Sequence, residues 1–181
     1  MSKVVVLGGC GAVGSVAAKT LAARTDFTEV VIGDMNMAKA RELDAANSKI
    51  TVVEVDASDA QSIKKAIAGV VLNCVGPFYR TVQMVLSAVI ESGINYVDIC
   101  DDVDVTLDIL ALDETAKRAG VTAVIGMGAS PGATNLLAKY LVETQLEEAE
   151  TIDIFHCHGG QPIEGAGGIG QRSMGSLAST A

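Results

Sequence analysis

The sequence predicts an α/β protein built on a doubly wound, mostly parallel sheet. Two features of the chain indicate this fold: short apolar runs alternate with amphipathic stretches, and a glycine-rich turn at Gly9–Gly14 follows the first apolar run. The composition agrees, because 49% of the residues are hydrophobic while only 3% are aromatic. The core is therefore expected to be aliphatic, as it usually is around buried parallel strands.

Each apolar run predicts a strand, and the stretch behind it predicts a helix. The strands are expected at Lys3–Leu7, Glu29–Gly33, Ile50–Asp56, Val70–Val75, Asn95–Ile99, Thr122–Ile125 and Ile152–Cys157. The helices are expected at Ala12–Ala23, Asn36–Ala46, Ala60–Ala68, Thr81–Ser92, Val105–Ala119 and Ala133–Gln145. In the first of these helices, the residues that share an apolar face are Val13, Val16, Ala17 and Leu21. Six units of strand followed by helix predict a Rossmann sheet with helices on both faces.

The net charge of −9 argues against two classes of partner. An acidic surface repels nucleic-acid phosphates and anionic membranes, and no run of Lys or Arg opposes it. No apolar stretch has the length of a membrane span, and no signal peptide is visible, so we expect a cytoplasmic protein. The four cysteines, at positions 10, 74, 100 and 157, lack the spacing of a zinc site, so we expect reduced thiols and no bound metal.

The glycine-rich turn has the spacing of a dinucleotide-binding loop and lies between a predicted strand and a predicted helix. Gly9 allows a sharp turn, Gly11 leaves room for a pyrophosphate, and Gly14 lets the helix lie close to the sheet. The backbone N–H groups at the helix start, near Ala12 and Val13, face the anion. The alternative is a glycine-rich turn that serves packing alone.

A second register of the same turn is open, because Gly8 also gives the Gly-x-x-Gly-x-x-Gly spacing of short-chain reductases. Those enzymes need a Tyr-x-x-x-Lys pair for proton transfer. None of the three tyrosines has a lysine four residues later. Catalysis of the short-chain type is therefore not expected.

Asp34 ends the second predicted strand, twenty residues beyond Gly14. A carboxylate at this place can accept hydrogen bonds from both hydroxyls of an adenosine ribose and would repel a 2′-phosphate. Met35 follows it with no arginine alongside, although Lys39 and Arg41 lie one turn further on. We therefore expect NAD rather than NADP, without excluding NADP. The alternative role of Asp34 is to cap the next helix.

Two further turns follow strands that end at the same edge of the sheet. At the end of the third strand, Asp56 beside Ala57 can accept a hydrogen bond from an adenine amine, or Ser58 there simply caps the next helix. The fourth strand ends beside the switch point of a doubly wound sheet, where ligands collect. The turn after it consists of Val75, Gly76, Pro77 and Phe78. We expect its backbone to approach the ribose and nicotinamide; the alternative is a turn whose Gly-Pro pair serves only to fix the course of the chain.

The composition of the chain changes near residue 150. The acidic segment Glu143–Glu150 precedes the last predicted strand, and glycines crowd the chain after Cys157. Glycine at that density cannot hold a packed element by itself. We therefore predict a dinucleotide-binding domain over residues 1–150 and the beginning of an incomplete second domain over residues 151–181.

Four segments together carry a family resemblance: the glycine turn, Val75–Phe78, Tyr96–Asp101 and Gly126–Gly132. They resemble the saccharopine dehydrogenase-like family, which includes glutamate-forming saccharopine reductases, carboxynorspermidine synthases and lysine 6-dehydrogenase-like proteins. The stretch His158–Gly165 is similar to the segment that leads into the α+β substrate domain of that family. The likeness spans nearly all of this chain, but less than half of a typical family member.

The resemblance implies NAD(P)-dependent hydride transfer to or from a C–N bond of an amino-acid or imine substrate. The substrate pocket would lie between this domain and the second one. Family members commonly pair through the second domain, which leaves a homodimer of this chain open. Three departures from the saccharopine reductases argue against saccharopine itself: Ser130 replaces an aspartate, Cys100-Asp101-Asp102 replaces a segment with a tyrosine, and His158 replaces a cysteine.

Three residues are candidates for catalysis: Asp101, Ser130 and His158. Asp101 follows the fifth strand at the ligand-binding edge, where it can hold a substrate ammonium or accept a proton, or else cap a helix in solvent. Ser130 would place a hydroxyl near the substrate amine where the family has its carboxylate. His156 and His158 alternate along the last predicted strand, so at most one reaches the cleft, where His158 can carry a proton.

These observations favour an oxidoreductase represented mainly by its cofactor domain. A non-catalytic NAD(H)-sensing regulatory domain is the alternative, since such domains share the glycine turn and the acid after the second strand. They lack the Ser130–Gly132 helix start and the tail at His158. Without a complete second domain, we expect this polypeptide alone to be weakly active or inactive.

Overall fold

The computed structural model describes residues 2–24 and 26–155, and it confirms the predicted α/β fold. All pairings within the six-stranded sheet are parallel, and the strand order is β3-β2-β1-β4-β5-β6. The strands are β1 (Lys3–Leu7), β2 (Glu29–Asp34), β3 (Ile50–Glu54), β4 (Val70–Asn73), β5 (Asn95–Asp98) and β6 (Ala123–Val124). This order places the switch point between β1 and β4, as a doubly wound Rossmann sheet requires.

Alternation along the central strand explains why the sheet has two separate apolar faces. Val4 and Val6 of β1 belong to a buried cluster on one face, while Val5 and Leu7 belong to a larger cluster on the other. In register, Val5 lies between Val31 of β2 and Val71 of β4. Because both faces are covered here, β1 is apolar at nearly every position.

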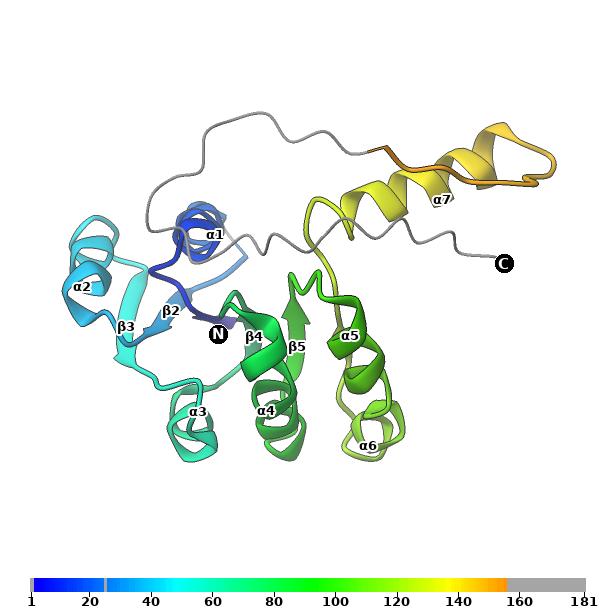
Figure 1. Cartoon of the computed structure of the whole chain (residues 1–181). Helices are drawn as coiled ribbons and strands as arrows, with labels where there is room; N and C mark the ends of the chain where they lie inside the picture. The colour runs from blue at the N-terminus through cyan, green and yellow to red at the C-terminus, as the bar shows by residue number, and fades with distance from the viewer. Residues whose placement is uncertain (1, 25, 156–181) are drawn as a thin grey trace.

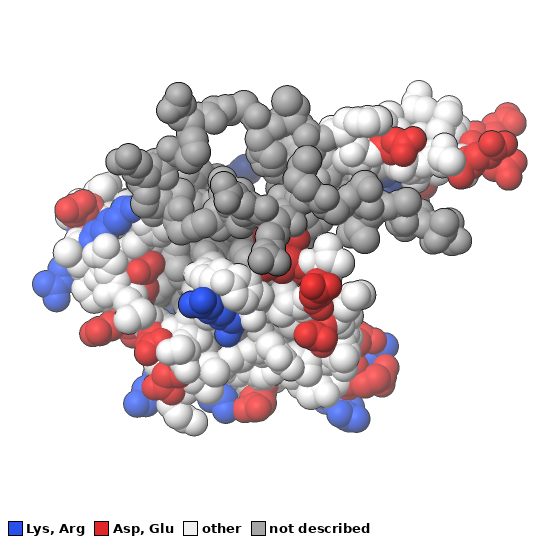
Figure 2. All heavy atoms as spheres, viewed as in Figure 1, with Lys and Arg blue, Asp and Glu red and all other residues white. Residues whose placement is uncertain are grey.

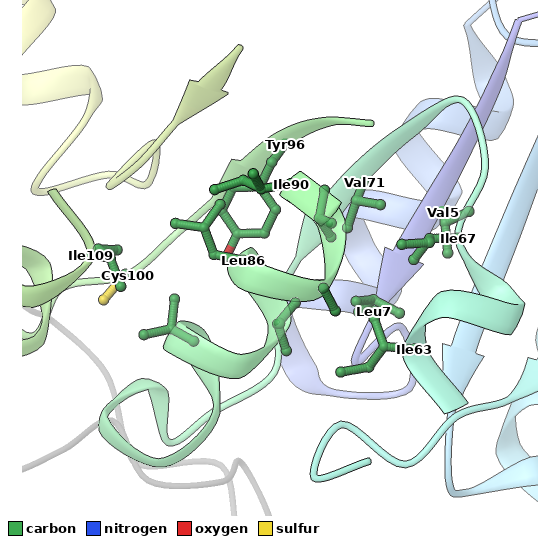
Figure 3. Packing of buried hydrophobic residues seen from close by; sticks show 14 of the residues in the cluster. Val5, Leu7, Ile63, Ile67, Val71, Leu86, Ile90, Tyr96, Cys100 and Ile109 are labelled. Carbon is green, nitrogen blue, oxygen red and sulfur yellow. The ribbon is translucent and has the colours of Figure 1, made fainter. Parts of the chain in front are cut away.

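Helices cover the two faces unequally (Figure 1). On one face lie α1 (Ala12–Ala23) and α2 (Met37–Ala45), and on the other lie α3 (Ala60–Ala66), α4 (Phe78–Glu91), α5 (Val103–Leu110) and α6 (Asp113–Arg118). The larger cluster fills the space under α3 to α6, and Figure 3 shows Tyr96 of β5 beside Leu86 and Ile90 of α4 within it. The smaller cluster lies under α1 and α2, over β1, β2 and β3.

The apolar face predicted for α1 is not the face that packs against the sheet. Val13 and Val16 are 55% and 63% exposed, whereas the buried residues are Gly14, Ala18 and Ala22. The helix lies so close to the glycine turn that only small residues fit beneath it. Of the predicted face, Leu21 packs against the smaller cluster while Val13 and Val16 do not, so hydrophobic spacing located the helix correctly but misplaced the centre of its buried face.

One long helix was predicted at Val105–Ala119, but the structure has two, α5 and α6, separated at Ala111 and Leu112. The charges suit a separate second helix. Its first turn carries Asp113 and Glu114 and its last turn carries Lys117 and Arg118, which is the arrangement that complements a helix dipole. The other predicted elements differ from the observed bounds only at their ends, by one to three residues in most cases.

Beyond the sheet, α7 (Ala133–Gln145) extends away from the domain and has no buried residue (Figure 1). Acidic side chains gather at its far end (Figure 2), where Glu143, Glu147 and Glu148 are exposed. The strand predicted at Ile152–Cys157 is contradicted over its described part: Ile152–Phe155 forms no strand and is exposed, because no neighbouring strand is there to pair with it. Its last two residues lie outside the described part. No helix among the described residues has the length and apolarity needed to cross a membrane.

Candidate dinucleotide-binding site

The carboxyl ends of all six parallel strands meet at one edge of the sheet, where ligands bind in folds of this kind. The predicted cofactor residues all lie at the carboxyl ends of β1, β2, β3 and β4, in the turns that follow, or at the starts of the next helices. The turns after β5 and β6 carry Asp101 and Ser130. The fold therefore brings these turns to one edge, while His158 lies outside the described residues.

The glycine turn is shaped by close backbone contacts. Gly8 has a φ of 71° and donates to the Gly33 carbonyl at 2.8 Å, and Gly11 donates back to the Gly8 carbonyl at 3.0 Å. A Cβ at Gly14 would lie 2.2 Å from the Gly8 oxygen, and a Cβ at Gly9 would lie 2.8 Å from Ile32 Cγ2. Both glycines are thus required by packing alone, before any ligand is considered.

Gly11 differs from its neighbours in the turn. A Cβ there would meet only the Gly8 oxygen, at 3.2 Å, and the residue is exposed. Gly11 is also the N-cap of α1, and the first bond of the helix ladder runs from the Ser15 amide to its carbonyl at 3.0 Å. The amides of Ala12 and Val13 precede that bond, so they are free of the helix ladder and are available to an anion.

Asp34 closes the site on the β2 side, and its carboxylate is held at both oxygens. One oxygen accepts from the Cys10 amide at 2.9 Å and the other from the Asn36 amide at 2.9 Å. The residue that caps α2 is Asn36, whose side chain accepts from the Lys39 amide at 3.1 Å. Asp34 is therefore bound to the glycine turn instead of serving as the helix cap, and Met35 beside it is 69% exposed.

The turn after β3 is organised by its own side chains. Asp56 accepts from both the amide and the hydroxyl of Ser58, at 2.8 and 2.6 Å, and these bonds lower the pKa of its carboxyl. The residue that caps α3 is Asp59, not Ser58. Asp56 and Ala57 are half-buried just beyond the carboxyl end of β3.

In the turn after β4, Gly76 and Pro77 are exposed, and the peptide bond between them is cis. The Phe78 side chain is 8% exposed and belongs to the large core cluster. Only the backbone of Phe78 therefore remains at the edge. Val75 is half-buried and donates its amide to the Asn73 side chain at 3.0 Å.

An apolar hollow of about 520 Å³ adjoins the glycine turn. Its walls come from the start of α1, from β4 and from the turns after β5 and β6, and the lining residues are Ala12, Val13, Val16, Ala17, Leu72, Cys74, Ile99, Met127 and Gly128. Burial and then the charge of Asp98 raise the pKa of the Cys74 thiol to about 11, so this wall is uncharged at neutral pH. The hollow suits a flat, uncharged ring next to bound phosphates.

Sequence reasoning missed three buried polar residues behind this hollow: Asn73, Tyr96 and Asp98. The Asn73 amide donates to the Tyr96 hydroxyl at 2.9 Å, and that hydroxyl donates to Asp98 at 2.9 Å. Burial raises the Tyr96 pKa well above its usual value, and the Asp98 charge adds to this effect, so the hydroxyl keeps its proton. The signal was a polar residue within each of two apolar strands, Asn73 in VVLNCV and Asp98 in NYVDIC.

The catalytic candidates occupy different environments. Asp101 is exposed beside Asp102, whose carboxylate accepts from the Tyr79 amide at 3.2 Å. Ser130 is half-buried and accepts from the Thr134 hydroxyl at 3.2 Å at the start of α7. No group of His, Cys, Asp and Glu in the described part of the chain is arranged to hold a metal ion.

Comparison with known proteins agrees with this geometry. Residues 4–124 match the family described as the saccharopine dehydrogenase NADP binding domain. The chain is 29% identical to carboxyaminopropylagmatine dehydrogenase of Synechocystis sp. and 26% identical to carboxynorspermidine synthase of Vibrio cholerae, over 88% and 84% of its length. It spans 42% of the length of each.

Apo saccharopine dehydrogenase (L-Glu forming) from Saccharomyces cerevisiae has the same fold. The TM-score is 0.67 at 22% sequence identity, and the match covers 79% of this chain and 31% of the yeast chain. The shared fold and the family match over residues 4–124 agree with each other. The protein belongs to the saccharopine dehydrogenase NADP binding domain family, whose match covers residues 4–124.

Proposed function

We propose that the chain binds NAD and serves an oxidoreductase that acts on the C–N bond of an amino-acid-like substrate. The single observation that carries the cofactor preference is the Asp34 carboxylate, fixed by the Cys10 and Asn36 amides beside the glycine turn. The names of the relatives, a carboxyaminopropylagmatine dehydrogenase and two carboxynorspermidine synthases, support the substrate class.

The residues present fit a dinucleotide. The free amides of Ala12 and Val13 would hold the pyrophosphate, and Gly11 leaves it room. Asp34 would accept the ribose hydroxyls, and Asp56 with Ala57 would border the adenine. The backbone from Val75 to Phe78 and the apolar hollow would take the nicotinamide half. When bound, the nicotinamide supplies the hydride chemistry.

The preference for NAD follows from charge and position. A 2′-phosphate would have to lie beside the Asp34 carboxylate, and the carboxylate cannot turn away without losing its bonds to two backbone amides. Met35 offers no positive charge to compensate. We therefore favour NAD, although the matched family takes its name from NADP.

On the substrate side, we propose that Asp101 and Ser130 face the reacting amine, with His158 as a third candidate. An exposed carboxylate at Asp101 can hold an ammonium group, and the Ser130 hydroxyl can donate or accept a hydrogen bond there.

The three cysteines of the described part are free thiols, which supports a reducing compartment such as the cytoplasm.

Titration of the chain with NADH and NADPH tests the cofactor proposal. The reduced nicotinamide is itself fluorescent, so the change in its emission on binding measures the affinity for either cofactor. We expect NADH to bind at least about tenfold more tightly, a difference of about 1.4 kcal/mol. Asp34→Asn should remove most of this preference, while Asp44→Asn, the same change on the exposed side of α2, should keep it. Tight NADPH binding with weak NADH binding would overturn the assignment of Asp34.

A further inference from the structure

A buried hydrogen-bonded chain, Asn73–Tyr96–Asp98, links the turns after the last three strands. Asn73 and Asp98 are both fully buried, and Tyr96 is 1% exposed. Among the described residues, Asn73 and Asp98 are the only buried ones with an amide or a charged side chain. No Lys or Arg pairs with Asp98 within the described part of the chain.

A carboxylate in the core is costly unless donors surround it. Asp98 meets this condition. One oxygen accepts from the Cys100 amide at 3.0 Å and from the Gly126 amide at 2.8 Å, and the other accepts from the Tyr96 hydroxyl at 2.9 Å. Its backbone carbonyl also accepts from the Met127 amide at 2.8 Å. Asp98 thus joins the turn after β5 to the turn after β6.

Asn73 extends the connection to the turn after β4. Its side-chain oxygen accepts from the Val75 amide at 3.0 Å, while its nitrogen donates to Tyr96 at 2.9 Å. No described side-chain N or O atom in the interior lacks a partner, so the chain is fully satisfied. Networks of this kind fix the geometry of the groups that they connect.

These contacts lie directly behind the apolar hollow. Cys74 follows Asn73, Ile99 follows Asp98, and Met127 donates to the Asp98 carbonyl; all three line the hollow. None of the network residues touches the glycine turn or Asp34 through a hydrogen bond. The glycine turn meets this half only where Gly8 lies against the backbone of Cys74 and Val75, and the network's own side-chain bonds end at the turns after β4, β5 and β6.

We propose that Asp98, with Tyr96 and Asn73, is a positioning residue that sets the shape of the nicotinamide end of the site. The proposal rests on the proposed dinucleotide function. In the absence of Asp98 the turns after β4, β5 and β6 would lose their common anchor, and the hollow would lose its fixed walls. The glycine turn would still hold the pyrophosphate and adenosine.

The experiment compares two ligands on the same variants. ADP-ribose contains the adenosine and pyrophosphate but no nicotinamide, so it reports on the glycine turn alone. In Asp98→Asn the single side-chain oxygen can keep the bonds from the Cys100 and Gly126 amides. The side-chain NH2 group then faces the Tyr96 hydroxyl and cannot accept its hydrogen bond. We expect NADH affinity to fall about tenfold and ADP-ribose affinity to stay within about twofold.

Two further variants keep the result interpretable. Tyr96→Phe removes one hydroxyl from the chain of bonds and should give the same split between ligands with a smaller loss. Asp108→Asn, an exposed aspartate on α5, is the matched control and should change neither affinity. Circular dichroism and thermal melting show whether each variant is folded, and if Asp98→Asn does not fold, Tyr96→Phe decides the question.

The outcomes separate this proposal from the function on which it rests. An unaltered chain that binds neither ligand overturns both. An unaltered chain that binds both, with variants that lose NADH and ADP-ribose equally or lose neither, overturns only the positioning role, because a merely structural contribution would not discriminate between the ligands.

Discussion

The two halves of the carboxyl edge are built by opposite means. At the β1–β2 half, the chain approaches itself through glycines, and a side chain at Gly9 or Gly14 would collide with neighbouring atoms. At the β4–β6 half, three buried polar side chains link the turns to one another through hydrogen bonds. The first half requires residues without a side chain, and the second requires polar side chains whose hydrogen bonds are all made.

The comparison teaches how each half is specified. The contacts of the glycine turn join residues within a few positions of one another, except where it meets β2 and where Gly8 lies against the backbone of Cys74 and Val75. The polar network joins Asn73, Asp98 and Gly126, which are far apart in sequence and meet only because β4 and β5 are paired in register. We therefore expect substitutions in the first half to act through steric clash and those in the second to act through charge and hydrogen bonding.

The largest effect should come from Gly14→Val. The first added carbon would lie 2.2 Å from the Gly8 oxygen and 2.9 Å from both Gly8 C and Gly9 Cα, which are backbone atoms that cannot easily give way. Clashes in a packed region typically cost 1–3 kcal/mol, so we expect a loss of about 3 kcal/mol in the free energy of unfolding, together with loss of NADH binding. Chemical denaturation and fluorescence titration measure the two quantities.

Two variants of the same helix and turn sharpen this test. Ala23→Val introduces the same valine side chain at an exposed position of α1 and should change stability by no more than about 0.5 kcal/mol. Gly11→Val adds bulk where the first carbon meets only the Gly8 oxygen at 3.2 Å, so it should reduce binding far more than stability. Unchanged nucleotide affinity in Gly11→Val would contradict the pyrophosphate site itself.

The next effect concerns charge at the other half. Burial and the Asp98 charge raise the Cys74 pKa from 9.0 to about 11 in the folded protein. The unfolded thiol deprotonates near its ordinary value, so the stability that Cys74 contributes is complete below about pH 9 and is lost as the pH rises to about 11. A two-unit shift corresponds to about 3 kcal/mol once the titration is complete.

Denaturation at pH 8 and at pH 10.5, compared between the native chain and Cys74→Ala, measures this contribution. Other groups titrate in the same interval, but the difference between the two proteins isolates the thiol. We expect the native chain to lose more stability than the variant. In Asp98→Asn the Cys74 pKa should fall toward its ordinary value, because one of its two causes is removed. Equal losses in native chain and variant would show that Cys74 is not perturbed.

Sequence reasoning was most successful where contacts are local. The positions of the first six strands, the doubly wound parallel sheet and the place of the glycine turn were predicted from the apolar runs and from Gly9, Gly11 and Gly14, whereas the strand order comes from the structure. It failed where the answer depends on distant neighbours. The Asn73–Tyr96–Asp98 chain exists only across paired strands, and the strand predicted at Ile152 needs a partner that the described sheet does not provide.

The same limit explains the wrong face of α1, and it gives the prediction with the smallest effect. Hydrophobic spacing favoured Val16, but the close approach at Gly14 turns Ala18 toward the sheet: Val16 is 63% exposed and Ala18 is fully buried. Val16→Ser should therefore change the free energy of unfolding by less than about 0.5 kcal/mol. Ala18→Val, a smaller change in polarity at the buried position, should cost about 2 kcal/mol through overpacking. Thermal or urea unfolding of the two variants measures the contrast, and a greater loss in Val16→Ser than in Ala18→Val would restore the face that the spacing predicted.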